Sequence, residues 1–373
     1  MQRFFSIIVL MFIVSGFGFS QCTTRQNIQT GAQRTREYIP MLTGKKVGVV
    51  ANHTSLVNGV HLVDTLLAEN IDVTRIFSPE HGFRGDKDAG AYVSNYKDKK
   101  TGLPVISLYG KRKKPKAEDL TDLDVIVFDI QDVGVRFYTY ISTMHYVMEA
   151  CAETGTRLLV LDRPNPNGFY IDGPVLDTMH QSFVGMHPIP LVHGMTIAEL
   201  ARMINAEGWL SDENRCDLKW VKCANYTHDS LYQLPVKPSP NLPNMRSVYL
   251  YPSLGLFEGT IVNVGRGTPF PFQVFGHPRF EKSFSYTPRP IKGASSNPKH
   301  KGERCFGVDL REVPMDTLTD AAGVHLKWLK LAYEELGMPK DFFLPFFSYL
   351  SGNTELQKLL EAGTSPDEIK KSW

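Results

Sequence analysis

The chain is poor in cysteine, balanced in charge and without zinc-binding motifs. Five cysteines in 373 residues are too few for a disulfide framework. Cys216 and Cys223 are close enough in sequence to predict one bridge, with two free thiols as the alternative. Lys and Arg number 41 against 39 Asp and Glu, and a nucleic-acid partner is not expected because phosphate binding needs a marked basic excess. No Cys-x-x-Cys pair or His-Glu-x-x-His helix occurs, so no protein-built metal site is predicted.

Two loop motifs of common enzyme classes are also missing. The segment Asn52-His53-Thr54-Ser55, which follows the first apolar run, is not the glycine-rich turn of a dinucleotide site. No Gly-x-Ser-x-Gly elbow of a serine hydrolase occurs either. The sequence therefore predicts no nucleotide cofactor, and it favours chemistry that depends on carboxylates.

The N-terminus has the features of a secretory signal peptide over residues 1–21. Arg3 supplies a positive charge, an apolar run covers Phe4 to Phe19, and Ser20-Gln21 offers a cleavage site. The run is too short and isolated to serve as a membrane span. Cys22 is a candidate for a lipid anchor, although Gln21 is an unfavourable residue before a lipidated cysteine. We expect export to the periplasm or cell surface, with residues 22–40 as a polar linker.

Short runs of valine, isoleucine and leucine alternate with segments of helical spacing. Continuous apolar runs are typical of strands covered on both faces, so the pattern predicts an α/β fold with a mostly parallel sheet and crossover helices. The predicted strands are 47–51, 73–78, 105–109, 125–130 and 158–162. Helices are expected at 62–67, at 140–153, after the capping-box pair Thr196 and Glu199, near 318–336 and from Pro366. Four prolines within 235–243 predict an irregular connection.

Polar side chains follow four of the five predicted strands. Because ligands of open parallel sheets bind beyond the carboxyl ends of the strands, these segments are expected to form a site. Their carboxylates, amides, arginines and tyrosines are groups that bind hydroxyls, acetamides and carboxylates. The segments are 52–55, 79–85, 129–138 and 162–168.

Several of these strings resemble those of the exo-β-N-acetylmuramidases of the NamZ type. They occur in order from about residue 45 to the end of the chain. The strings are Ala51-Asn52-His53-Thr54, Ser78-Pro79-Glu80-His81-Gly82-Phe83-Arg84-Gly85, Phe128-Asp129-Ile130-Gln131-Asp132-Val133-Gly134-Val135-Arg136-Phe137-Tyr138, Asp162-Arg163-Pro164-Asn165-Pro166, Val192-His193-Gly194-Met195-Thr196, Pro240-Asn241-Leu242-Pro243, Tyr251-Pro252-Ser253-Leu254, Phe257-Glu258-Gly259-Thr260 and Gly265-Arg266-Gly267-Thr268.

The resemblance implies a secreted protein of two domains. These are a Rossmann-like N-terminal catalytic domain at 41–240, without a nucleotide, and a smaller α+β C-terminal domain at 241–373 that helps to close the cleft. The implied activity is release of a non-reducing terminal N-acetylmuramic acid (MurNAc) from peptidoglycan fragments such as MurNAc-GlcNAc, without a cofactor. Family members usually continue beyond Trp373, so the resemblance also implies a shortened C-terminal domain.

Glycoside hydrolysis needs a proton donor for the leaving oxygen and a negative group near the anomeric carbon. Glu80 is the predicted acid, because it follows a strand and partial enclosure would raise the pKa of its carboxyl. Its partner stays open among Asp132, Asp129 and Glu258. Asp132 could alternatively orient the 2-acetamido group of the substrate for attack on the anomeric carbon.

The lactyl carboxylate of MurNAc predicts an arginine in the pocket that donates two parallel hydrogen bonds. The candidates are Arg136, Arg163 and Arg266, with a structural ion pair as the alternative for Arg163. The predicted contacts to hydroxyl or acetamide groups are Asn52, His53, His81, Tyr138, Asn165 and His193, with a buried structural role as the alternative for His193 and for Tyr138.

The competing function is a peptidoglycan- or amino-sugar-binding protein that has the cleft but not the catalysis. An esterase or amidase acting on cell-wall peptides is a third class, but its nucleophile motif is missing. Substitution of Glu80 by Gln separates the first two classes, because it should abolish hydrolysis while leaving sugar binding in place.

Overall fold

The computed structural model describes residues 27–80, 82–84, 95–110 and 112–373. The predicted signal peptide, Cys22 and His81 lie outside these residues. Within the described ranges, no helix has both the length and the apolar character needed to cross a membrane.

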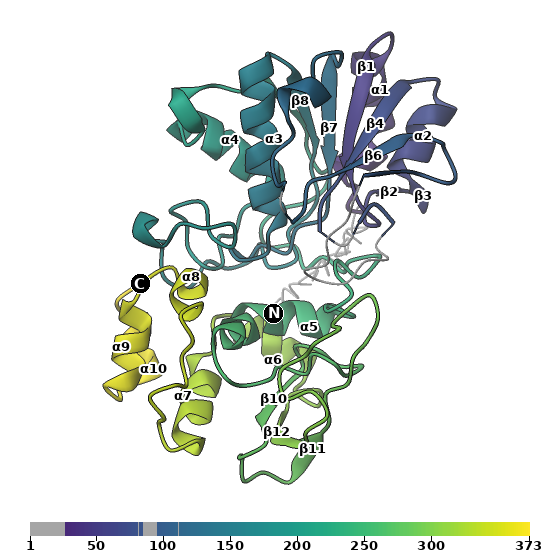
Figure 1. Cartoon of the computed structure of the whole chain (residues 1–373). Helices are drawn as coiled ribbons and strands as arrows, with labels where there is room; N and C mark the ends of the chain where they lie inside the picture. Colours follow the sequence, from purple (N-terminus) through teal and green to yellow (C-terminus); the bar gives the residue numbers. More distant parts are fainter. Residues whose placement is uncertain (1–26, 81, 85–94, 111) are drawn as a thin grey trace, which may run out of the picture.

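A seven-stranded sheet of the described residues, in the order β5-β6-β4-β1-β7-β8-β9, forms the centre of the N-terminal half (Figure 1). All neighbouring strands are parallel except β5, which is antiparallel to β6 at one edge. The five predicted strands are confirmed, with small shifts at their ends. The strands are β1 (Lys46–Ala51), β4 (Asp72–Ser78), β5 (Tyr96–Lys97), β6 (Pro104–Ser107), β7 (Val125–Asp129), β8 (Arg157–Leu161) and β9 (Leu218–Val221).

Helices cover both faces of this sheet (Figure 1). Alternate strand residues face opposite layers: Val49 and Val127 pack in the cluster that includes α1 and α2, whereas Ile126 and Phe128 pack in the cluster that includes α3 and α4. This two-sided burial explains the continuous apolar runs. The helices are α1 (Thr35–Leu42), α2 (Leu62–Ala68), α3 (Tyr140–Thr154) and α4 (Ile197–Glu207), and a small hairpin of β2 (Leu56–Val57) and β3 (Val60–His61) precedes α2.

The predicted helix ends in this half are confirmed. Thr196 and Glu199 form the capping box of α4, in which each side chain accepts a hydrogen bond from the other residue's backbone N–H. Gly155 ends α3 in the left-handed conformation, with φ of 71°. The proline-rich connection forms no regular helix or strand between residues 235 and 243.

The C-terminal half contains a small antiparallel sheet, β10-β12-β11, and a set of helices. Its apolar core is continuous with the α3 side of the main sheet: Phe137 lies edge-on against Tyr251 of α5, with ring centroids 5.2 Å apart. The elements are α5 (Met245–Leu254), β10 (Val274–His277), β11 (Phe284–Tyr286), β12 (Cys305–Asp309), α6 (Met315–Asp320), α7 (Leu326–Glu335), α8 (Phe347–Ser351), α9 (Glu355–Glu361) and α10 (Pro366–Lys370).

Three sequence-based expectations are wrong or incomplete. The predicted long helix near 318–336 is two helices, because residues between them bind elsewhere: the Asp172 carboxylate accepts from the Val324 N–H at 2.7 Å. Strand β9 was not predicted, since exposed Lys219 interrupts its apolar run at the sheet edge. The two-residue strand β5 is too short to give a sequence pattern.

The predicted Cys216–Cys223 disulfide does not form, and both thiols are free. Extended strand β9 lies between the two cysteines. Seven residues at about 3.3 Å each carry Cys223 roughly 20 Å away, far beyond the reach of a disulfide. Cys216 instead lies beside buried Cys151, whose pKa is raised well above its usual range by the hydrogen bond to Cys216 and by burial.

Candidate active site

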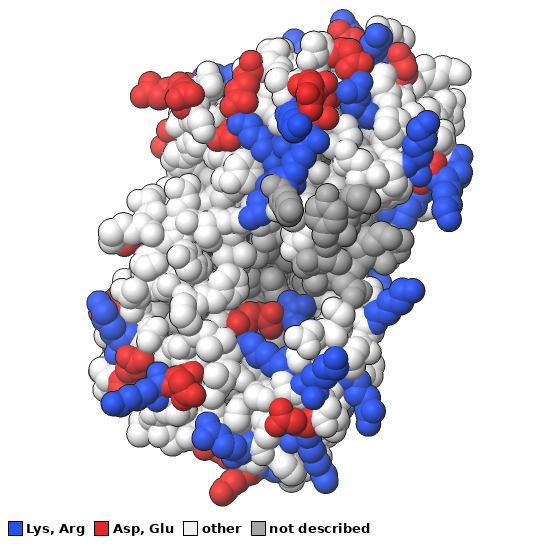
Figure 2. Space-filling view, in the orientation of Figure 1, with Lys and Arg blue, Asp and Glu red and all other residues white. Residues whose placement is uncertain are grey.

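A pocket of about 440 Å³ lies where the two halves of the chain meet. Its size is within the range of small-ligand sites. Figure 2 shows acidic and basic side chains side by side at the hollow between the halves. Residues from the end of β4, the start of α3, the proline-rich connection and the C-terminal half line the pocket: Glu80, Tyr138, Thr139, Tyr140, Ser239, Asn241, Leu242, Tyr251, Arg266 and Phe272.

Glu80 enters this pocket from the loop that follows β4. The Thr139 hydroxyl donates a hydrogen bond to Glu80 Oε2 at 3.3 Å. Thr139 is the N-cap residue of α3, but its side chain makes no capping hydrogen bond. Its hydroxyl donates to Glu80 instead. The carboxyl of Glu80 therefore lies beside the N-terminus of a 15-residue helix, half-buried at the pocket wall.

Asp132 lies in the loop after β7 and is buried. Its Oδ2 accepts from the Gly134 N–H at 2.7 Å, while Oδ1 has no hydrogen-bond partner among the described residues. This turn requires glycine, because Gly134 has φ of +74° and an added Cβ would lie 2.2 Å from Asn165. Burial raises the pKa of Asp132 to about 7, against the effect of the Gly134 N–H. Such a carboxyl can gain or lose a proton near neutral pH.

Three tyrosines connect Asp132 with the pocket. Tyr138, Tyr140 and Tyr251 line the pocket and have raised pKa values, mainly because of burial, with the charge of Asp132 adding to the effect in all three. Their rings contact one another edge to face, with Tyr138 at 4.9 Å from Tyr140 and 5.9 Å from Tyr251. Asp132 therefore lies just behind this aromatic wall.

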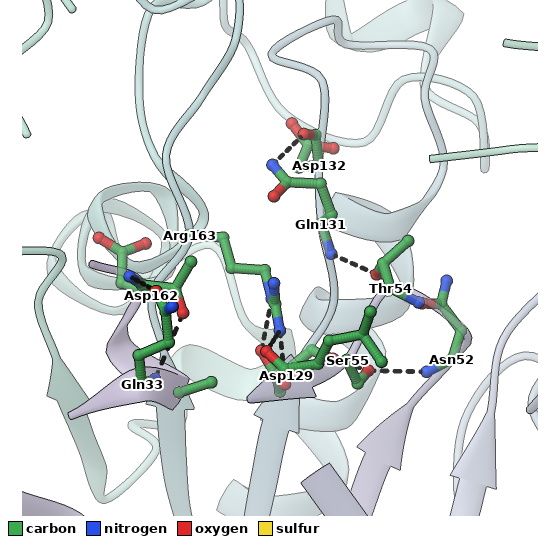
Figure 3. A network of polar contacts seen from close by, with 12 residues as sticks. Gln33, Asn52, Thr54, Ser55, Asp129, Gln131, Asp132, Asp162 and Arg163 are labelled. Carbon is green, nitrogen blue, oxygen red and sulfur yellow. Dashed lines mark hydrogen bonds and ion pairs between the residues drawn. The ribbon is translucent and has the colours of Figure 1, made fainter. Parts of the chain in front are cut away.

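Asp129 and Arg163 form a closed ion pair at the ends of β7 and β8 (Figure 3). Arg163 donates from Nε and from its Nη2 atom to the two oxygens of Asp129, at 2.6 and 2.9 Å. Both side chains are almost fully buried. Burial acts to lower the pKa of Arg163, but the Asp129 charge outweighs it and raises that pKa. The prediction of Arg163 as a substrate ligand is therefore wrong, and its predicted alternative, a structural ion pair, holds with Asp129 as the partner.

Arg136 is also structural. It is fully buried and donates to four backbone carbonyls, those of Pro174 and Ile189 at 2.6 and 2.8 Å and those of Leu350 and Ser351 at 3.2 and 2.7 Å. The last two belong to α8, whose final carbonyls would otherwise be unsatisfied. The predicted contact of Arg136 with substrate is wrong, because its guanidinium is used to fasten the C-terminal half to the loop that carries Asp132.

Arg266 is the one predicted arginine that lines the pocket. Its Nε donates to Glu258 Oε2 at 2.9 Å, and its guanidinium carbon lies 5.0 Å from the centre of the Phe272 ring. Glu258 is thus the partner of Arg266. Partly buried Lys299 supports the same segment by donating to the carbonyls of Phe257 and Glu258 at 2.9 and 3.1 Å. The loss of hydration at this site lowers the pKa of Lys299 to about 8.

The predicted amide and histidine ligands divide into two groups. Asn52 and His53 lie close to the pocket: Asn52 lowers the pKa of Tyr140 against the larger effect of burial, and His53 Nε2 lies 2.9 Å from the Lys237 carbonyl oxygen. Asn165 is buried and structural, because its side chain donates to the Met195 carbonyl and accepts from the Asn167 N–H, both at 2.9 Å. Its predicted contact with substrate is wrong.

The side chain of His193 is fully buried, so its predicted contact with a sugar is also wrong, and the buried alternative holds. Tyr138 lines the pocket, and its hydroxyl donates to the Pro238 carbonyl at 2.8 Å.

The described residues contain no group of three or more His, Cys, Asp or Glu side chains that could hold a metal ion.

Seven pocket residues were not predicted: Thr139, Tyr140, Ser239, Asn241, Leu242, Tyr251 and Phe272. Most of them come from the proline-rich connection and from the C-terminal half, which carry no strand-end pattern. The strings around Asn241 and Tyr251 were part of the resemblance, and they were the one sequence feature that could have pointed to these residues.

Comparisons with known proteins agree with this architecture. The family profile "Exo-beta-N-acetylmuramidase NamZ, N-terminal" matches residues 47–246, and the corresponding C-terminal profile matches residues 249–373. The peptidoglycan beta-N-acetylmuramidase NamZ of Bacillus subtilis (strain 168) is 41% identical over 95% of this chain and 89% of its own length.

Two solved structures of DUF1343 family proteins from Bacteroides fragilis have the same fold. One has a TM-score of 0.87 and 46% identity, and the other has a TM-score of 0.75 and 31% identity. Each alignment covers 93% of this chain and 94% of the solved one. The profiles, the identity and the fold together show that this chain belongs to the NamZ family of exo-β-N-acetylmuramidases.

Proposed function

We propose that this protein hydrolyses the β-glycosidic bond of a non-reducing terminal MurNAc residue in peptidoglycan fragments such as MurNAc-GlcNAc. The observation that carries the proposal is the meeting of Glu80 and Arg266 in one pocket. A carboxyl can protonate the leaving oxygen, and an arginine can bind the lactyl carboxylate that distinguishes MurNAc from GlcNAc. Family membership supports the same reaction class.

Glu80 is the proton donor in this mechanism. The Thr139 hydroxyl fixes its Oε2 atom, which holds the carboxyl in place at the pocket wall. As the bond between the anomeric carbon and the bridging oxygen breaks, Glu80 protonates that oxygen. A water molecule then bonds to the anomeric carbon through its oxygen and gives one of its two protons to an enzyme carboxylate, which leaves a hydroxyl group on the sugar.

Asp132 is the partner carboxyl. Two contacts support this choice over the other two candidates: Asp129 binds Arg163 through both oxygens, and Glu258 binds Arg266. Asp132 keeps one oxygen without a partner among the described residues. In its charged form it can stabilise the positive charge that develops on the sugar ring without touching the ring.

Arg266 is the ligand of the lactyl carboxylate. Glu258 engages its Nε atom at 2.9 Å, and the Phe272 ring lies under its guanidinium. These two contacts fix the plane of the guanidinium, which leaves its terminal nitrogens directed to bind a carboxylate through two hydrogen bonds.

Incubation with MurNAc-GlcNAc, followed by mass spectrometry and early-time NMR of the anomers, tests the proposal. The protein should release MurNAc, and Glu80→Gln should reduce the rate by at least about 100-fold while sugar binding is retained. Glu207→Gln, at an exposed site on α4, is the matched control and should keep the full rate. Sugar binding without any release by the unaltered protein would instead establish the non-catalytic binding function.

We also infer that the protein is exported and acts in cell-wall turnover and muropeptide recycling in the periplasm or at the cell surface. The positive residue and apolar run at Arg3 and Phe4 to Phe19 support export. Fractionation of cells that produce the full chain, with N-terminal sequencing of the product and a test for lipid on Cys22, would check the location and the cleavage site.

A further inference from the structure

His193 lies next to Asp132 because two loops pair like strands. Val135 and Val192 form an antiparallel bridge, the Arg136 N–H donates to the Leu191 carbonyl at 2.8 Å, and the His193 N–H donates to the Gly134 carbonyl at 3.3 Å. This pairing places the His193 side chain beside the Asp132 turn. His193 Nε2 lies 3.8 Å from Asp132 Oδ2.

The hydrogen bonds of His193 define which ring nitrogen carries the proton. Nδ1 accepts from the Met195 N–H at 3.2 Å, so in the neutral ring the proton is on Nε2, the atom that faces Asp132. Nε2 has no hydrogen-bond partner among the described residues. Burial, followed by the positive charge of Arg136, lowers the pKa of His193 to about 3, so the ring stays neutral at physiological pH.

We propose that His193 is a positioning residue that donates its Nε2 proton to Asp132 and thereby fixes the orientation and the protonation equilibrium of that carboxyl. The separation of 3.8 Å is longer than a hydrogen bond, and we expect it to shorten when substrate closes the site, as is common for catalytic contacts. The catalytic half of this inference rests on the proposed function, whereas the contact itself does not.

A neutral hydrogen-bond donor beside the Asp132 carboxyl affects its protonation differently from a cation. An arginine such as Arg163 occupies both oxygens of its partner Asp129, whereas a neutral ring N–H can orient Asp132 and still allow it to titrate. The other described groups that interact with Asp132 are the N–H groups of Gly134 and Val133 and the phenols of Tyr138, Tyr140 and Tyr251. None of these is a cation, so His193 is the side chain best placed to tune the carboxyl.

NMR of protein labelled with ¹³C in aspartate tests the contact without reference to activity. The Asp132 signal is assigned by its loss in Asp132→Asn. His193→Phe keeps a planar ring but removes the Nε2–H dipole that faces the carboxylate from 3.8 Å, so the charged form is less stabilised and the titration midpoint should rise by up to about one pH unit. His193→Gln keeps a donor and should lie nearer to the unaltered protein. An unchanged midpoint in folded His193→Phe would overturn the proposal.

The unaltered protein offers a second readout that does not depend on a variant that folds. The ¹⁵N chemical shifts of the His193 ring should show a neutral ring with the proton on Nε2 from pH 5 to pH 9. A proton on Nδ1 would overturn the proposal, because Nε2 could then only accept a hydrogen bond.

Kinetics test the catalytic half. His193→Phe should lower kcat about 10- to 100-fold, the usual effect of losing such a supporting contact, and should move the acidic limb of the pH profile upward, with KM nearly unchanged. His193→Gln should restore part of kcat. In the Asp132→Asn background the His193→Phe effect should vanish, and an equal loss there would count against coupling. If the unaltered protein releases no MurNAc, the proposed function fails, and the NMR titration still decides the role of His193.

Discussion

Two carboxyl groups three residues apart, at the end of β7, have opposite surroundings. Asp129 is the last residue of the strand, and Arg163 binds both of its oxygens. Asp132 lies in the following loop, where it accepts a hydrogen bond from the Gly134 N–H and faces a neutral histidine. Its other oxygen has no partner within the described parts of the chain. Both carboxyl groups are buried. The comparison teaches that burial alone does not define a functional carboxyl, because the partner decides whether an oxygen stays available for a proton or another donor.

The largest expected effect comes from breaking the closed pair. Arg163→Met leaves the Asp129 charge buried without compensation and should lower the free energy of unfolding by about 3–5 kcal/mol. Urea denaturation followed by circular dichroism measures this loss. The double variant Asp129→Leu/Arg163→Met removes both charges and should recover most of the stability. If Arg163→Met alone is as stable as the unaltered protein, the pair has no structural role.

The sequence was sufficient to predict which segments meet at the carboxyl-end edge of the sheet. It was not sufficient to predict which charged side chains form ion pairs there. Apolar runs defined β1, β4, β7 and β8, and parallel strands bring their polar ends together, so Glu80 could be placed near the site. Which arginine binds which carboxylate depends on side-chain directions between strands. The adjacent pair Asp162 and Arg163 suggested an ion pair, yet Asp162 caps α4 by accepting from the Ala198 N–H and the Thr196 hydroxyl.

The pocket residues that come from the C-terminal half were the hardest part of the site to predict from the sequence. Tyr251 and Phe272 reach the pocket through packing between α5 and the loop that carries Arg266, and this packing has no sequence period. Arg136 illustrates the reverse error. It stands in a polar segment after a strand, as a ligand would, but the chain folds α8 over it and uses the guanidinium to satisfy helix carbonyls.

The ion pair between Glu258 and Arg266 differs from the buried Asp129–Arg163 pair because Arg266 lines the pocket. Its side chains are 28% and 23% exposed, unlike the sealed Asp129–Arg163 pair. Arg266→Met should therefore cost little stability but should reduce kcat/KM for a MurNAc glycoside about 10- to 100-fold, which corresponds to the loss of one or two charge-assisted hydrogen bonds. Hydrolysis of the matching GlcNAc glycoside, which lacks the lactyl group, should change little.

That pair of substrates serves as the internal control for Arg266. A loss of equal size on both glycosides would mean that Arg266 acts on the reaction or on the fold, and it would remove the proposed contact with the lactyl carboxylate. Arg266→Lys keeps the charge but not the planar pair of donors, so it should recover only part of the preference for MurNAc.

Asp132→Asn should show a gain of stability that depends on pH. The pKa of Asp132 is about 7 in the folded protein and about 4 in an unfolded chain. Between these values the folded state binds more protons than the unfolded state, so the unaltered protein loses stability from this group as the pH rises from about 4 to 7. Asparagine does not titrate and avoids this loss. The stability of the variant relative to the unaltered protein should therefore rise between pH 4 and pH 8, by up to about 4 kcal/mol.

Thermal or urea unfolding of both proteins at several pH values measures this difference, and groups common to both, such as Asp162 with its pKa raised by burial to about 6, cancel in the subtraction. The same Asp132→Asn protein should hydrolyse MurNAc-GlcNAc very slowly. A variant that is more stable and less active would show that the buried carboxyl is kept at a cost to stability because the reaction needs it. If the difference in stability were constant across pH, the pKa of Asp132 would be the same in the folded and the unfolded protein, and the expected effect of burial on this carboxyl would be absent.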